Sequence, residues 1–139
     1  MRPLVRLSGL SKLYGGVAAV KPLDLDIAAG DFCAILGPSG CGKSTLLRMI
    51  AGFVEPSAGR VEIDGVDVTG IGPERRPTNM VFQGYGLFPH LTVAQNIGFG
   101  LSLRQRPRQE IDARVAEALL LVRLDGLGGR GIDQLSGGQ

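Results

Sequence analysis

The sequence of 139 residues contains no tryptophan, a single histidine, His90, and only two cysteines, Cys33 and Cys41. No group of cysteines and histidines has the spacing of metal ligands, which excludes a zinc or iron–sulfur site of that kind. Two cysteines are too few for a disulfide framework, so we expect free thiols in a reducing compartment. A lone histidine is more often structural than catalytic, and His90 is therefore not a candidate catalytic residue.

Long apolar runs are also missing. The longest, such as residues 32–37 and 118–122, are far shorter than the roughly 20 residues that a membrane-spanning helix needs. The first residues, Met1-Arg2-Pro3, lack the apolar stretch of a signal peptide. We therefore expect a cytoplasmic protein whose role at a membrane, if it has one, is peripheral.

The chain also has little excess of charge of either sign. The net charge of +2 is too small to indicate nucleic acid as the main partner, so no nucleic-acid partner is expected. Basic residues cluster at Arg75-Arg76 and at Arg104, Arg106 and Arg108. Short runs of charge usually lie on the solvated surface, and we expect both clusters there.

The remaining composition, 44% hydrophobic and 20% charged, is typical of a globular protein. Apolar periodicity and turn residues predict an α/β fold in which a strand, a glycine loop and a helix come first and a helical region follows. The expected strands are 4–8, 17–27, 32–36, a hairpin over 60–68 turning at Asp64-Gly65, and 80–82. The expected helices are 43–51, ended by Gly52, about two turns after a capping box at Thr92 and Gln95, and 108–124.

The glycine loop at residues 37–44 is the motif whose chemical function is easiest to predict. Gly37, Gly42, Lys43 and Ser44 satisfy the pattern G-x-x-x-x-G-K-[ST] of a phosphate-binding loop. Glycines let the backbone approach an anion closely, so that amides of about residues 40–45 converge on one phosphate at a helix start. Lys43 adds a full charge and the Ser44 hydroxyl is a hard oxygen ligand for Mg²⁺. We therefore predict that the loop binds the phosphates of ATP or a close relative.

Two alternatives apply to this loop. A glycine-rich turn before a helix can match the pattern by chance, but here an apolar segment precedes the pattern and an amphipathic one follows it. Cys41 lies inside the loop. It is interpreted as a small residue that fits there, and modification of its thiol is the alternative.

Four motifs together make the sequence resemble the nucleotide-binding domains of ABC transporters, over essentially the whole chain. In chain order they are Tyr14 in Lys12-Leu13-Tyr14-Gly15, the Walker A loop Gly37-Pro38-Ser39-Gly40-Cys41-Gly42-Lys43-Ser44-Thr45, the Q-loop region Val81-Phe82-Gln83 with Leu87 to Val93, and the signature Leu135-Ser136-Gly137-Gly138-Gln139. Any one of these could arise by chance, whereas four in the family's order are specific.

The resemblance implies roles for these residues. Tyr14 stacks on the adenine with Val17 beside it, and Gln83 approaches Mg²⁺ and the attacking water. The Walker A residues bind ATP, with Ser44 as a Mg²⁺ ligand. The signature binds the γ-phosphate of ATP held by a second nucleotide-binding subunit, through Ser136, Gly137, Gly138 and Gln139. Two such subunits then form a head-to-tail dimer with two composite sites.

A closer likeness is to the ATPases of polyamine, ferric iron, sulfate and sugar importers. It rests on Glu74-Arg75-Arg76-Pro77 and on residues 96–101. It implies an ATPase subunit at the inner face of the plasma membrane that couples ATP binding and hydrolysis to solute import, with integral membrane permease subunits and a solute-binding protein as partners. Polyamine and ferric iron are the favoured solutes. Gly84 and Gly86 stand where serine and alanine are usual, which loosens the segment facing the permease.

Some parts of the family pattern do not occur in the chain. The Walker B carboxylates and the switch histidine are expected after residue 139, so we expect a partial nucleotide-binding domain that ends before the Walker B strand and does not hydrolyse ATP alone. Residues 1–83 are expected to form the β subdomain and phosphate-loop core, and residues 84–139 the helical subdomain. Strand 32–36 is then expected to have an unpaired edge and bare apolar surface. The alternatives are a nucleotide-binding module without turnover, or a soluble ABC protein outside transport.

Overall fold

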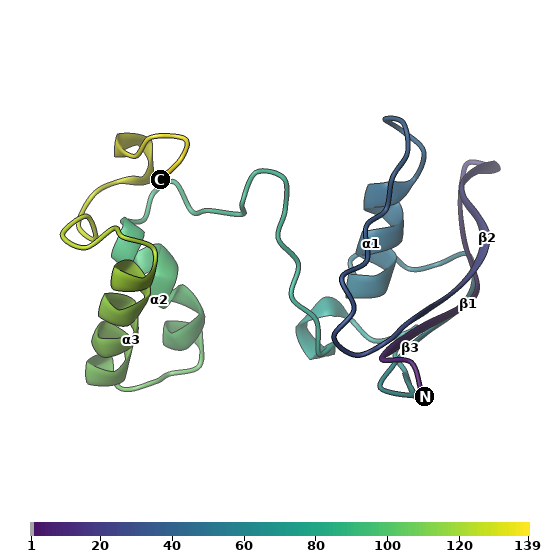
Figure 1. The fold of residues 1–139 in the computed structure, drawn as a ribbon, viewed down its shortest axis with the longest axis horizontal. Helices are drawn as coiled ribbons and strands as arrows, with labels where there is room; N and C mark the ends of the chain where they lie inside the picture. The colour runs from purple at the N-terminus through teal and green to yellow at the C-terminus, as the bar shows by residue number, and fades with distance from the viewer. Residues whose placement is uncertain (1) are drawn as a thin grey trace. The chain divides into compact units, whose positions relative to one another are not determined.

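The computed structural model describes residues 2–139 and divides into two compact units, one ending at Met80 and the other spanning Val81–Gln139. The first unit is built on an antiparallel sheet with the strand order β2-β1-β3-β4. Its strands are β1 (Val5–Tyr14), β2 (Val17–Ile27), β3 (Ala58–Ile63) and β4 (Val66–Asp67) (Figure 1). The two hairpins turn at Gly15-Gly16 and Asp64-Gly65, where all four residues have positive φ, as two-residue hairpin turns require. The hairpin expected at residues 60–68 is therefore confirmed.

Helix α1 (Lys43–Ala51) packs its apolar side on this sheet. Leu46 and Met49 share a buried cluster with Leu7, Leu10 and Val61, which come from β1 and β3. The helix ends at Gly52, which takes the left-handed conformation with φ 86°, as expected from the sequence. Packing on the sheet fixes the axis of α1, and the helix start in turn fixes the glycine loop in front of it.

Arg76 holds the other end of this helix. Its side chain is only 7% exposed. The guanidinium donates to the carbonyl oxygens of Met49 and Ile50 in the last turn of α1, at 2.7 and 2.9 Å, and to those of Ile71 and Thr69, at 2.7 and 3.0 Å. Burial lowers the pKa of Arg76 from its ordinary value.

The expectation that both residues of Arg75-Arg76 lie on the solvated surface is therefore wrong for Arg76. Arg75 is exposed and pairs with Glu74 within the short 3₁₀ helix η1 (Pro73–Arg75). Local charge cannot distinguish two adjacent arginines. Unsatisfied carbonyls at the end of α1 create the site that Arg76 fills.

Two expected strands do not form. Residues 32–36 and 80–82 have no strand pairing among the residues described. Phe32 and Leu36 are 98% and 90% exposed, and Val81 is 82% exposed. A strand exists only through hydrogen bonds to a neighbour, and the described sheet ends at β2 and β4 without reaching either segment. The bare apolar surface expected at residues 32–36 is present.

The second unit is a helix pair. Helices α2 (Val93–Leu103) and α3 (Arg108–Leu121) enclose a core of Val93, Val115, Leu119 and Leu124. Gly98 permits their close contact, because a Cβ there would lie 2.9 Å from a methyl group of Ile111. Helix α2 is longer than the two turns expected, and α3 ends three residues earlier than expected. The short 3₁₀ helix η2 (Ile132–Gln134) follows α3.

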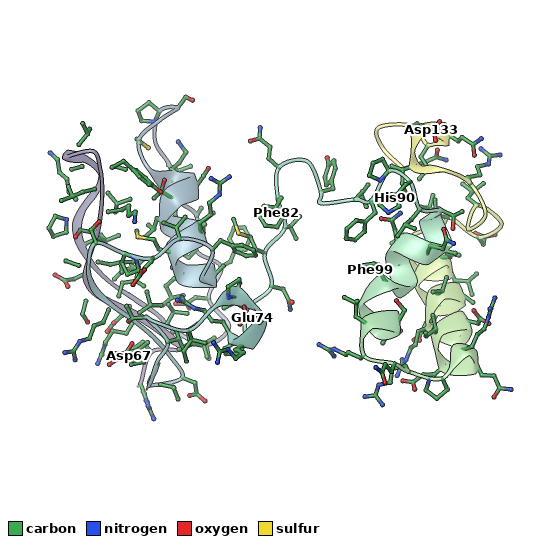
Figure 2. The ribbon with its side chains drawn as sticks, turned by 180° about the vertical axis from the view of Figure 1, so that it is seen from behind. Asp67, Glu74, Phe82, His90, Phe99 and Asp133 are labelled. Carbon is green, nitrogen blue, oxygen red and sulfur yellow. The ribbon has the colours of Figure 1, made fainter. Side chains whose placement is uncertain are left out.

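The start of α2 is fixed by side-chain hydrogen bonds from the N-cap residue and from the first turn of the helix. Thr92 and Gln95 form the expected capping box. Asn96 accepts from the amide of Phe88 at 2.8 Å and donates to the carbonyl oxygens of Phe88, Leu91 and Thr92 at 3.1, 3.2 and 2.9 Å. Phe88 also packs its ring against Phe99, and Figure 2 shows Phe99 and His90 within this unit.

The segment between α3 and η2 completes the capping of α2. The amides of Val93 and Ala94 donate to the carbonyl oxygens of Arg130 and Gly128, at 2.9 Å each. These are first-turn amides, which have no partner within their own helix. Over residues 2–139 no helix is long and apolar enough to cross a membrane.

Candidate functional site

The glycine loop leads directly into α1. Gly40 and Gly42 have φ of 81° and 93°, the left-handed region that side-chain-bearing residues rarely adopt. A Cβ on Gly37 would lie 2.7 Å from the Cys41 sulfur. The amides of residues 42–45 meet no acceptor within residues 2–139. Free amides at a helix start, together with the helix dipole, form a binding site for an anion such as phosphate.

Gly42 also lies directly against β2. A Cβ at this position would lie 2.3 Å from the carbonyl oxygen of Ala19 and 3.1 Å from a methyl group of Val20. The loop therefore touches β2 at a glycine, where any side chain would collide with the strand. This contact sets the spacing between the loop and the β1–β2 hairpin.

Lys43 curls back over the loop. Its ammonium donates to the carbonyl oxygens of Gly37 and Pro38 at 2.7 and 2.6 Å and lies 3.4 Å from the Cys41 sulfur. These contacts hold a full positive charge next to the free amides. Ser44, one residue on, is exposed at the first turn of α1. Its hydroxyl is the type of oxygen donor that Mg²⁺ accepts, so this residue fits the expected metal.

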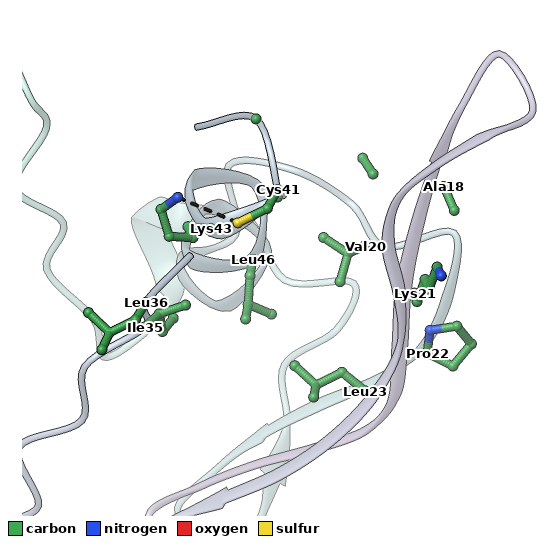
Figure 3. A pocket seen from close by; sticks show the side chains of 13 residues that line it. Ala18, Val20, Lys21, Pro22, Leu23, Ile35, Leu36, Cys41, Lys43 and Leu46 are labelled. Atoms are coloured by element: carbon green, nitrogen blue, oxygen red, sulfur yellow. Dashed lines mark hydrogen bonds between the residues drawn. The ribbon is translucent and has the colours of Figure 1, made fainter. Parts of the chain in front are cut away.

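A hollow of about 460 Å³ adjoins the loop. Figure 3 shows its walls, with Val20 and Leu23 from β2, Ile35 and Leu36 from the segment before the loop, and Cys41, Lys43 and Leu46 from the loop and α1. Most of this lining is apolar. The loop therefore has a polar side, where its amides are free, and an apolar side facing β2.

Tyr14 and Val17 are directly opposite each other at the end of the β1–β2 hairpin. They are 51% and 72% exposed. The structure thus brings together the two residues expected beside the adenine. The ammonium of Lys12 lies over the Tyr14 ring, 5.2 Å from its centre. Sequence reasoning gave Lys12 no role, although its spacing of two from Tyr14 on a strand signals a shared face.

The residues of the Q-loop region belong to the second unit. Gln83 is exposed in a turn over residues 83–86, in which Tyr85 and Gly86 have φ of 61° and 67°. The amide of Tyr85 donates to the carbonyl oxygen of Phe82 at 2.9 Å. The turn presents the Gln83 side chain to solvent, as a residue that contacts a ligand requires.

The signature residues form a turn stabilised by two mutual hydrogen bonds. The Ser136 amide donates to Oε1 of Gln139 at 3.0 Å, and the Gln139 amide donates to the Ser136 carbonyl oxygen at 2.9 Å. Gly137 and Gly138 lie between them, and all four residues are exposed. The side-chain bond to the Ser136 amide is one half of a capping box, the arrangement typical of a helix start.

Comparison with known proteins identifies the family. The family model described as ABC transporter matches residues 20–139, most of the chain. The chain belongs to the ABC transporter family. Its resemblance to nucleotide-binding domains, first noted from four motifs, is confirmed.

Curated relatives share about half of their residues with this chain. The spermidine/putrescine import ATP-binding protein PotA of Acidothermus cellulolyticus is 54% identical over 141 residues, covering 99% of this chain and 37% of that protein. The putrescine transport ATP-binding protein PotG of Escherichia coli is 52% identical, covering 100% of this chain and 37% of that protein. The chain therefore spans less than two fifths of the length of these relatives.

Solved structures confirm the fold class. The dimeric ATP-binding cassette MJ0796, bound to ADP and Pi, superposes with a TM-score of 0.84 at 32% identity, covering 97% of this chain and 64% of that one. CbiO1 from Clostridium perfringens superposes with a TM-score of 0.80 at 31% identity, covering 98% of this chain and 57% of that one. The chain has the ABC-type P-loop fold, with an antiparallel sheet and a helical part.

Proposed function

We propose that this chain is the nucleotide-binding part of an ATPase subunit that energises the import of a polyamine. The observation that carries the proposal is the loop before α1, where free amides, the Lys43 ammonium and the helix start converge. In this proposal the loop binds the phosphates of ATP and Ser44 binds Mg²⁺. Tyr14 and Val17 receive the adenine.

The other site roles extend this proposal. Gln83 orients the attacking water and Mg²⁺, and the turn over Ser136–Gln139 binds the γ-phosphate of ATP in a partner subunit. Residues 1–83 act as the β subdomain and phosphate-loop core, and residues 84–139 as the helical subdomain. Hydrolysis also requires carboxylates that position Mg²⁺ and the attacking water. The dimeric structure of the MJ0796 cassette supports pairing with a second copy.

Polyamine is the solute proposed because relatives about 50% identical carry spermidine/putrescine or putrescine in their names. The subunit then works at the inner face of the plasma membrane with integral permease subunits and a solute-binding protein. Uptake of labelled putrescine and spermidine into cells that lack the gene tests this assignment. Loss of ferric iron uptake with normal polyamine uptake would overturn the choice of solute and leave nucleotide binding intact.

The nucleotide proposal is tested by ATP binding measured by calorimetry. Replacing Lys43 with methionine should weaken ATP binding at least tenfold, because charge-assisted hydrogen bonds of roughly 1.5–3 kcal/mol are lost. Arg48→Met is the matched control, since it removes an exposed positive charge at the far end of the same helix. Equal ATP affinity for the wild type and Lys43→Met would contradict the proposed site.

A further inference from the structure

The side chain of Lys12, on β1, reaches both the Tyr14 ring and the segment that follows α1. It is half-buried, in contrast to the exposed Tyr14. Its ammonium lies over the Tyr14 ring at 5.2 Å from the ring centre, within the range of a cation–π contact. The same ammonium donates to the carbonyl oxygen of Glu55 at 2.6 Å. A side chain with two such contacts has little freedom to leave the ring.

The position of Lys12 is fixed further by its neighbours. The amide of Leu13 donates to the Ser57 hydroxyl at 3.0 Å, and the Ser57 amide donates to the Ser11 carbonyl oxygen at 2.8 Å. The end of β1 is therefore joined on both sides of Lys12 to the segment that follows α1. Glu55 is part of that segment, so the two hydrogen bonds of Ser57 to β1 keep the Glu55 carbonyl oxygen near the Lys12 ammonium.

These contacts connect the Tyr14 ring to the phosphate loop. At one end of α1, Gly42 lies against Ala19 of β2. Beyond the other end, Glu55 and Ser57 bind the end of β1. The Tyr14 ring and the glycine loop are therefore held at a fixed spacing within the first unit. A nucleotide that places its phosphates on the loop requires its base at a set distance, so the orientation of the ring matters for affinity.

We propose that Lys12 is a positioning residue for the nucleotide base, holding one face of the Tyr14 ring so that the exposed remainder of the ring receives the purine. This inference rests on the proposed function, because it needs ATP to bind at the loop. Lys12 contacts the ring, and no contact with the nucleotide is assigned to it. An ammonium on one face draws electron density from the ring, which favours stacking of an electron-rich base on the other face.

The test compares a ligand that has a base with one that has only phosphates. Binding of ATP and of inorganic tripolyphosphate is measured by calorimetry for the wild type, Lys12→Met, Lys12→Arg, Tyr14→Leu and the double variant Lys12→Met/Tyr14→Leu. Arg6→Met is the matched control, since it removes a positive charge from the same strand near its opposite end. Hydrogen exchange of β1 and β2 reports whether each variant keeps the hairpin.

We expect Lys12→Met to weaken ATP binding about threefold to fivefold, and tripolyphosphate binding less than twofold. Lys12→Arg should retain ATP affinity because it keeps a cation over the ring. In the Tyr14→Leu background, Lys12→Met should cause no further loss. Equal weakening of both ligands, or an additive loss in the double variant, would overturn the inference. Failure of the wild type to bind either ligand would overturn the proposed function, and this inference with it.

Discussion

Arg76 in the first unit and Asn96 in the second both bind several backbone groups from one side chain. Each joins a helix to a neighbouring loop through four hydrogen bonds. They differ in charge and burial, since Arg76 is charged and 7% exposed whereas Asn96 is neutral and half-buried. Arg76 binds the C-terminal end of α1, where carbonyl oxygens favour a cation, and Asn96 binds the loop at the N-terminal end of α2. Arg76 thus supplies donors to the free carbonyl oxygens at the end of α1, whereas Asn96 ties the loop over residues 88–92 to the start of α2.

The largest effect should come from removing Arg76. Arg76→Met removes the guanidinium donor from four carbonyl oxygens, of which that of Met49 is buried and keeps only the 3.3 Å bond from the Gly52 amide, and should lower the stability of the first unit by about 3 kcal/mol. Hydrogen exchange followed by mass spectrometry measures the stability of each unit separately. Arg75→Met is the matched control, because it removes the adjacent exposed arginine, whose ion pair contributes little. Equal losses from the two variants would show that the Arg76 network does not stabilise α1.

A smaller effect is expected in the second unit. Asn96→Ala should lower its stability by about 2 kcal/mol, since the amide and carbonyls of residues 88–92 lose a neutral partner. Exchange in α2 and in residues 88–92 should accelerate while exchange in β1 and β3 stays unchanged. Gln109→Ala, an exposed amide on α3, is the control. Equally faster exchange in β1 and β3 would contradict a local role for Asn96.

Loss of the capping box at the start of α2 should lower stability by a still smaller amount. Thr92→Ala removes the hydroxyl that accepts from the Gln95 amide at 3.2 Å and should cost about 1 kcal/mol. Thr92→Ser keeps the hydroxyl and should restore most of the loss. Urea unfolding followed by circular dichroism at 222 nm measures both variants. A serine variant as unstable as the alanine variant would indicate that the Thr92 methyl group, and not the cap, matters.

The smallest effect is a pH dependence in the first unit. The Thr69 hydroxyl and amide donate to Asp67 and lower its pKa below the ordinary carboxyl value. A lowered pKa stabilises the fold above the unfolded-state pKa of about 4, and this stabilisation disappears as pH falls through the folded-state value. The stability difference between wild type and Asp67→Asn should therefore be present at pH 6 and vanish at the acid end of a pH series of urea unfolding midpoints. A difference that grows on acidification would contradict this sign.

The sequence was sufficient for much of the fold because many elements depend on near neighbours. Gly52 ends α1 as expected, Asp64-Gly65 turns the hairpin, and Thr92 caps α2 with Gln95. Each of these features involves residues within a few positions of one another. The loop before α1 was equally predictable, since its glycines and Lys43 are consecutive in the chain. The pairing of Tyr14 with Val17 across a Gly-Gly turn is equally local, although the strand expected over residues 4–8 in fact runs on to Tyr14.

Other features depended on partners distant in sequence. The apolar run at residues 32–36 has the composition of a buried strand, yet Phe32 and Leu36 are exposed because no described strand pairs with it. The contact of Lys12 with Glu55 spans 43 positions, and that of Arg76 with Met49 spans 27. No pattern of neighbouring residues in the sequence predicts such contacts.

By itself the sequence determined the glycine loop before α1, the caps and turns around it, and membership of the ABC family, because these follow from residue order over short distances. Tertiary structure alone decided that Arg76 is buried while Arg75 is not, that Gly42 touches β2, and that an ammonium covers one face of Tyr14. The physical reason is that burial and hydrogen bonding depend on which groups meet in space. A carbonyl oxygen at the end of α1 accepts from whichever donor the folded chain brings to it.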